Sequence, residues 1–99
     1  MVDSKNSCFV AECFWPDVDE SDLATLDRRI EGALAGLTTE SAVRYLGSIL
    51  LREDEVVLCQ FEGRAESVRD VAERAEIPFE RILATAHSPW QLAQNAAGK

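Results

Sequence analysis

The sequence predicts an α+β domain whose elements follow the order strand, helix, strand, strand, helix, strand. Apolar, strand-like runs occur at four places, and two segments repeat apolar residues at helical spacing. The chain has 99 residues, enough for one domain, with an ordered core expected over about residues 8–88. This order is the ferredoxin-like βαββαβ arrangement, a four-stranded antiparallel sheet with two helices on one face. Many unrelated activities use that fold, so function must be argued from a site.

The first strand is predicted over residues 9–15, which are aromatic and apolar, and Pro16 ends it. Asp19 can cap the next helix, and Asp22 lies in its first turn, where negative charge suits the helix dipole. Gly36 is the predicted helix end. One apolar stripe follows this helix: Leu23, Leu26, Ile30, Leu34 and Leu37.

Residues 43–51 and 56–61 predict an antiparallel hairpin, because only a short charged turn separates them. Gly63 ends this hairpin. A second helix is predicted over residues 65–76, and Pro78 prevents its continuation. Its apolar side carries Val68, Val71, Ala72 and Ala75, and residues 81–86 read as the last strand.

The sheet face without helices is predicted to meet a partner. Each helix has a single apolar stripe, so both helices cover one face, whereas a solvated second face would alternate polar and apolar residues. In the predicted strands, apolar residues instead occur at both odd and even positions, and so on both faces of the sheet: Phe9, Val10, Phe14, Trp15, Leu46, Ile49, Leu50, Val56, Val57, Leu58 and Phe61. The expected partner is a second copy packed sheet to sheet, or a bound apolar ligand, or both.

Composition excludes some classes of partner. The net charge of −8 disfavours binding to nucleic acid and to anionic membrane surfaces. No apolar run approaches the ~20 residues of a membrane span, and residues 1–7 lack an apolar signal core, so a cytoplasmic protein is expected. The three cysteines, Cys8, Cys13 and Cys59, lack metal-type spacing and are expected to be buried free thiols.

Four stretches carry a resemblance to a known family over residues 9–88. They are FVAECFWP (9–16) with an acidic turn and Asp22-Leu23, VRYLGS (43–48), DEVVLCQFE (54–62), and AESVR (65–69) with AEIPFERI (75–82). In this order they resemble the small bacterial ferredoxin-like proteins of unknown function that include nickel-binding members. The resemblance implies a homodimer built as a dimeric α+β barrel, and it raises nickel as a candidate ligand.

Glu12 and Glu62 are acidic residues inside otherwise apolar strands. In the ferredoxin-like order the first and third strands are neighbours, so the two carboxylates could converge. A carboxylate pair suits a general acid or base, or a hard divalent cation. The alternative is that Glu62 lies in solvent at a strand end, and that Glu12 pairs with an arginine such as Arg44 or Arg81.

His87 follows the last strand, and its side chain titrates near neutrality. It could act as a base or join Glu12 and Glu62 around a ligand or metal ion, and the alternative is a surface residue. Imidazole sites for nickel favour several histidines, whereas this chain has one. The resemblance therefore assigns no metal ligand.

Tyr45, Ser48 and Gln60 are polar side chains on the second and third strands. Tyr45 and Gln60 are candidate ligand-binding residues, and a tyrosine, with its apolar ring and polar tip, suits an aromatic ligand pocket. The alternative is packing in the core or in a dimer interface. Trp15 and Trp90 could rim a pocket, or pack at the dimer interface or the chain end.

The leading hypothesis is a small homodimeric protein that binds a metal ion or a small molecule. A second hypothesis is a cofactor-free enzyme of the α+β barrel monooxygenase or cyclase type, acting on an aromatic or polyketide-like substrate. A third is a non-catalytic interaction subunit. The sequence contains no G-x-G-x-x-G motif, no P-loop and no G-x-S-x-G motif.

Overall fold

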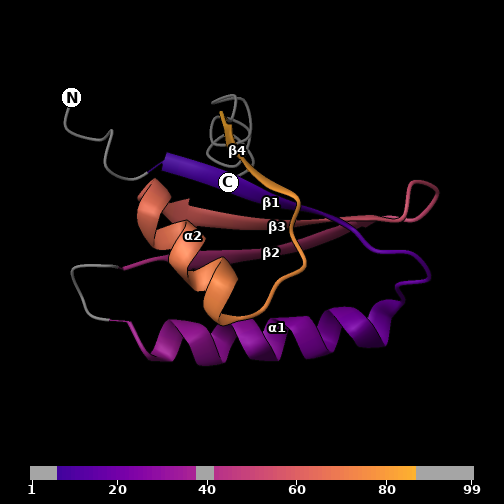
Figure 1. The fold of residues 1–99 in the computed structure, drawn as a ribbon, viewed down its shortest axis with the longest axis horizontal. Helices are drawn as coiled ribbons and strands as arrows, with labels where there is room; N and C mark the ends of the chain where they lie inside the picture. The colour runs from indigo at the N-terminus through magenta and orange to yellow at the C-terminus, as the bar shows by residue number, and fades with distance from the viewer. Residues whose placement is uncertain (1–6, 38–41, 87–99) are drawn as a thin grey trace, which may run out of the picture.

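A computed structural model describes residues 7–37 and 42–86 (Figure 1). Along the chain it contains β1 (Ser7–Phe14), α1 (Glu20–Ala35), β2 (Arg44–Leu51), β3 (Val56–Gly63), α2 (Ala65–Arg74) and β4 (Arg81–Thr85). The predicted order of elements is confirmed. The strands form one antiparallel sheet in the order β2-β3-β1-β4, which confirms that the first and third strands are central neighbours.

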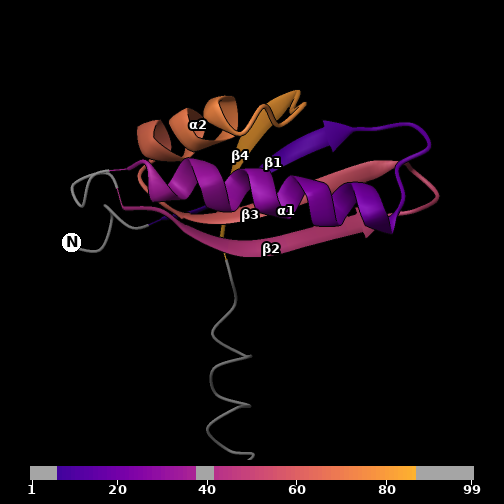
Figure 2. The same ribbon diagram turned by 90° about the horizontal axis from the view of Figure 1, so that it is seen from below.

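Both helices pack on the same face of this sheet (Figure 2). Side chains alternate between the two faces of a strand, and the register pairs Ala11 with Cys59 and Cys13 with Val57, so these four point to one side. They form the core together with Phe61 of β3, Leu26 and Ile30 of α1, and Val68, Val71 and Ala72 of α2, all of them fully buried. The predicted apolar stripes therefore do face the sheet.

The start of α1 is fixed by a capping box. The Asp19 carboxylate accepts a hydrogen bond from the Asp22 N–H at 3.0 Å, and the Asp19 N–H donates to the Asp22 carboxylate at 3.0 Å. Two backbone N–H groups that the helix leaves without partners are thereby satisfied. The bond from the Asp22 N–H, together with that from the Ser21 hydroxyl, lowers the pKa of the Asp19 carboxyl.

The end of α2 comes two residues before the predicted end because the chain reverses there in a Schellman motif. The Ile77 N–H donates to the Ala72 carbonyl at 3.0 Å, and the Glu76 N–H donates to the Glu73 carbonyl at 3.1 Å. This geometry needs a left-handed residue, which Glu76 supplies with φ of 57°. Arg29 of α1 joins the two helices by donating to the carbonyl of Ala75 at 2.9 Å.

A β-bulge in β2 decides which of its residues face the helices. The pairing with β3 shifts between Tyr45 and Gly47, so Leu46 is the extra residue. Gly47 has φ of 108°, a backbone conformation that glycine adopts without strain. Because one extra residue reverses the alternation of faces, the bulge turns Tyr45 toward the helices and Arg44 away from them.

Candidate functional site

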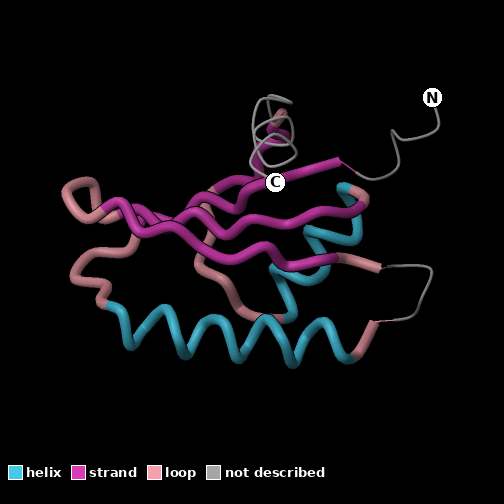
Figure 3. Tube along the Cα trace, turned by 180° about the vertical axis from the view of Figure 1, so that it is seen from behind, coloured by secondary structure: helices cyan, strands magenta, loops and turns pink. Residues whose placement is uncertain are grey.

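The face of the sheet opposite the helices is the candidate site (Figure 3). We call it the open face, because no helix among residues 7–37 and 42–86 packs on it. By register it carries Cys8, Val10, Glu12 and Phe14 of β1, Arg44, Gly47, Ile49 and Leu51 of β2, Val56, Leu58, Gln60 and Glu62 of β3, and Arg81, Leu83 and Thr85 of β4.

Large hydrophobic side chains are exposed on this face. Phe14 is 53% exposed, Ile49 44% and Leu51 40%, and Leu46 at the bulge is 40% exposed. Three of these four residues belong to the edge strand β2. Half-buried Leu58 of β3, Val10 of β1 and Leu83 of β4 continue the apolar surface across the sheet to the other edge. A continuous apolar patch of this kind marks a binding surface more often than isolated exposed side chains do.

Glu12 and Glu62 lie on this face, but the register keeps them apart. Glu12 is opposite Leu58, whereas Glu62 is opposite Cys8, so four residues separate the two carboxylates along the strands, about 13 Å. The hypothesis that they converge within one protomer is therefore wrong. These two carboxylates do not fit a shared nickel site, and the described part of the chain holds no group of three or more His, Cys, Asp or Glu side chains able to hold a metal ion.

Each of the two glutamates instead pairs with an arginine on the neighbouring edge strand. Glu12 accepts a hydrogen bond from Nε of Arg81, which confirms one of the arginines considered for it. Glu62 accepts one from Nη1 of Arg44 at 2.9 Å rather than standing alone in solvent. Two arginines and two glutamates therefore leave the open face with a balanced charge.

Tyr45 lies on the opposite side of the sheet and is part of the packing against α1. Its hydroxyl donates to the Asp27 carboxylate at 2.6 Å, and its ring lies 5.3 Å from the ring of Phe61. Burial, together with the bond to Asp27, raises the pKa of Tyr45 above its usual range. Asp27 was missed in the sequence, although a carboxylate beside the apolar stripe, three residues before Ile30, was a readable signal.

Gln60 is the one candidate residue in the middle of the open face. On β3 it lies between Val10 of β1 and Gly47 of β2, and its side chain is half-buried. Its amide makes no hydrogen bond with any residue that the structure describes. No atom beyond its chain neighbours lies within 4 Å of where a Cβ of Gly47 would stand, so Gly47 itself leaves space beside Gln60.

The cysteines divide between the two faces. Cys13 and Cys59 are buried free thiols between sheet and helices, as predicted, and the neighbouring Cys13 thiol, together with burial, raises the pKa of Cys59. Cys8 is free but only half-buried, because it lies on the open face rather than in the core. His87 and Trp90 lie outside the described residues.

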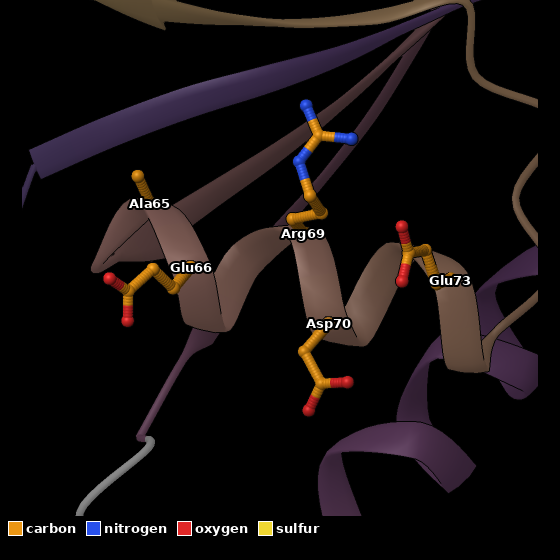
Figure 4. A pocket seen from close by; sticks show the side chains of 5 residues that line it. All are labelled: Ala65, Glu66, Arg69, Asp70 and Glu73. Carbon is orange, nitrogen blue, oxygen red and sulfur yellow. The ribbon is translucent and has the colours of Figure 1, made fainter.

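A shallow depression of about 300 Å³ lies on the outer side of α2, lined by Ala65, Glu66, Arg69, Asp70 and Glu73. Figure 4 shows these side chains pointing in different directions from the helix, so they do not converge on one point. Asp70 is already paired with Arg74 at 3.2 Å, and Arg69 lies over the ring of Phe79 at 5.7 Å. The depression therefore lacks a constellation for chemistry.

Comparison with known proteins does not place the chain in a family. It matches no family model, and no curated protein matches it significantly. Among the described helices, none is long and apolar enough to cross a membrane. The open face therefore has to be interpreted from its own residues.

Proposed function

We propose that this protein is a cytoplasmic homodimer that binds a small molecule between the open faces of its two sheets. The observation that carries the proposal is the exposed apolar surface of the open face, together with its balanced charges. The resemblance to small bacterial ferredoxin-like proteins, which form dimeric α+β barrels, points in the same direction.

The extent of the open face is close to what a specific dimer needs. Three strands of eight residues and one of five, about 4.8 Å apart and rising about 3.3 Å per residue, give a face of roughly 460 Å². Two such faces amount to roughly 900 Å² before the relief of the side chains is counted, close to the ~1,000 Å² of a specific interface. The exposed hydrophobic side chains of this surface also suit sheet-on-sheet packing.

The charges favour a second copy over the other large partners. The chain as a whole carries −8, so two copies repel each other at long range. On the open face, however, Arg44 and Arg81 neutralise Glu62 and Glu12, so close contact adds no unpaired charge. A nucleic acid or an anionic membrane would need a positive surface, which this face does not present.

A small molecule is favoured over a metal ion as the ligand. Both carboxylates of the open face are already paired with arginines and are about 13 Å apart, so they do not offer a hard cation a common site. An apolar interior with few polar groups suits an organic ligand. No residue of the open face is placed as an acid, base or nucleophile beside another, so binding rather than catalysis is proposed.

Sedimentation velocity over a dilution series tests the dimer. The chain should sediment as a dimer, and Ile49→Lys should shift it toward the monomer by burying a charge under the partner. Thr25→Lys is the matched control, because it adds the same charge to an exposed position on α1 and should leave the dimer intact. A wild-type chain that is monomeric throughout, or an Ile49→Lys variant that dimerises as tightly as the control, would overturn the proposal.

A further inference from the structure

In the proposed dimer, Gln60 would be a polar residue at the centre of the interface, where water is excluded. It lies on the central strand β3, with Val10 beside it on β1 and with Leu58 two residues away on the same face. A second sheet packed about 10 Å away would remove the water that its amide now faces. A buried amide without a partner costs about 1–3 kcal/mol, so in the dimer this amide needs a hydrogen-bonding occupant.

The surface beside this amide has room for one. Gly47 is the direct cross-strand neighbour of Gln60, and it contributes no side chain to the layer between the two sheets. Apart from its chain neighbours, no atom lies within 4 Å of where a Cβ of Gly47 would stand, and the bulge turns Tyr45, two residues before it, to the other face. Facing sheets are filled by interdigitated side chains, so a glycine at this position leaves a hollow in the interface, which the exposed side chain of Leu46 borders.

We propose that Gln60 and the hollow over Gly47 form the ligand subsite of the dimer, and that it takes a small, neutral, flat apolar molecule bearing a carbonyl. This inference rests on the proposed homodimer. Ile49 and Leu58 supply apolar walls, and the Gln60 NH₂ group donates to the ligand oxygen.

The ligand is neutral because the face offers it no free charge. The guanidinium groups of Arg44 and Arg81 are bound to Glu62 and Glu12, so an anionic ligand would have to break an ion pair to gain a cation. A cation would compete with the same arginines for the glutamates. An amide both donates and accepts hydrogen bonds without changing the net charge of the site.

Two probes that differ in one group test this assignment. Acetophenone carries a carbonyl where ethylbenzene carries a methylene, so their relative affinity isolates the hydrogen bond from the apolar contact. Each is titrated by NMR into the wild-type dimer and into Gln60→Leu. Replacing the amide should lower the ratio of acetophenone to ethylbenzene affinity by about fivefold, the value of one hydrogen bond. Thr25→Val, on the exposed side of α1, is the control and should leave the ratio unchanged.

A second readout does not depend on a variant. In the ¹⁵N-labelled wild-type dimer, the side-chain NH₂ signal of Gln60 should shift clearly more with acetophenone than with ethylbenzene, because both rings lie near it and only the ketone accepts a hydrogen bond. A dimer in which neither probe moves that signal, or in which Gln60→Leu leaves the affinity ratio unchanged, would overturn the subsite while leaving the dimer standing. A monomeric wild-type chain would overturn the subsite and the proposed function together.

Discussion

Replacing Phe14 by alanine should dissociate the proposed dimer while leaving the protomer folded. Phe14 is the last residue of β1 and has the most exposed large hydrophobic side chain among the described residues, at 53%. Its exposed half faces the same side as Ile49 and Leu51, so a second copy on the open face would cover it. The variant removes apolar area without adding a charge, which separates the hydrophobic contribution from electrostatics.

The magnitude follows from the exposed area. An aromatic side chain buries 150–250 Å², so the exposed half of Phe14 amounts to about 100 Å². At about 25 cal/mol per Å², and allowing for the area that alanine keeps, each copy loses about 2 kcal/mol. A two-fold interface contains the residue twice, so the dimer loses about 4 kcal/mol, which is about a thousandfold in Kd.

Sedimentation equilibrium over a concentration series measures that Kd, and urea unfolding of the dissociated variant measures the protomer. Thr25→Ala serves as the control on the helix side, and its dimer Kd should equal that of the wild type. If Phe14→Ala changes the Kd by less than tenfold while the protomer remains folded, the open face is not the dimer interface, and the reasoning from its exposed residues fails.

Three further predictions concern single groups. Tyr45 is the only tyrosine, and its pKa is raised by burial and by its bond to Asp27, so its stabilisation is full below pH about 10 and is lost as pH rises further. Tyr45→Phe should remove this loss of stability at alkaline pH, which unfolding curves of the two proteins measure. In the wild type, phenolate absorbance follows the titration of Tyr45, and a phenolate that forms at the ordinary pH of tyrosine would contradict the prediction. Glu76→Gly should raise the free energy of unfolding by about 0.5–1 kcal/mol in urea, because the native φ is left-handed, and a loss of stability would exclude that explanation. Arg81→Met should weaken the dimer by leaving Glu12 unpaired beneath the partner, and adding Glu12→Leu should restore it. Equal sedimentation of both variants would contradict burial of this pair.

The fold was predictable because hydrophobic periodicity and chain-breaking residues agreed along the sequence. Helical spacing around Ile30 identified α1, and Pro16 and Pro78 limited the elements beside them. The end of α2 was harder to predict, because the residue with left-handed backbone there is Glu76 rather than a glycine or asparagine. A glutamate in that conformation depends on the surrounding contacts, among them the hydrogen bonds that Arg29 donates to the carbonyls after the helix.

The candidate site was predictable only in part, because it depends on strand register. Alternation counted back from Leu51 puts Tyr45 on the open face, but the bulge at Leu46 reverses it and turns Tyr45 to Asp27. No propensity in the sequence fixes the position of such a bulge, although Gly47 is the residue type that bulges favour. The presence of an uncovered apolar face, by contrast, followed from the single apolar stripe of each helix and from the apolar residues at both odd and even positions of the strands.

The same bulge explains why acidic residues in apolar strands need not mark a catalytic centre. By shifting β2 one residue against β3, it brings Arg44 directly opposite Glu62 on the open face, where opposite charges on neighbouring strands stabilise each other. Glu12 meets Arg81 on the other edge in the same way. Each carboxylate already forms an ion pair with an arginine on the neighbouring strand, so its charge is neutralised without a ligand. What remains without a partner in the centre of that face is the Gln60 amide, and recognition by neutral hydrogen bonding is the chemistry that such an arrangement leaves available.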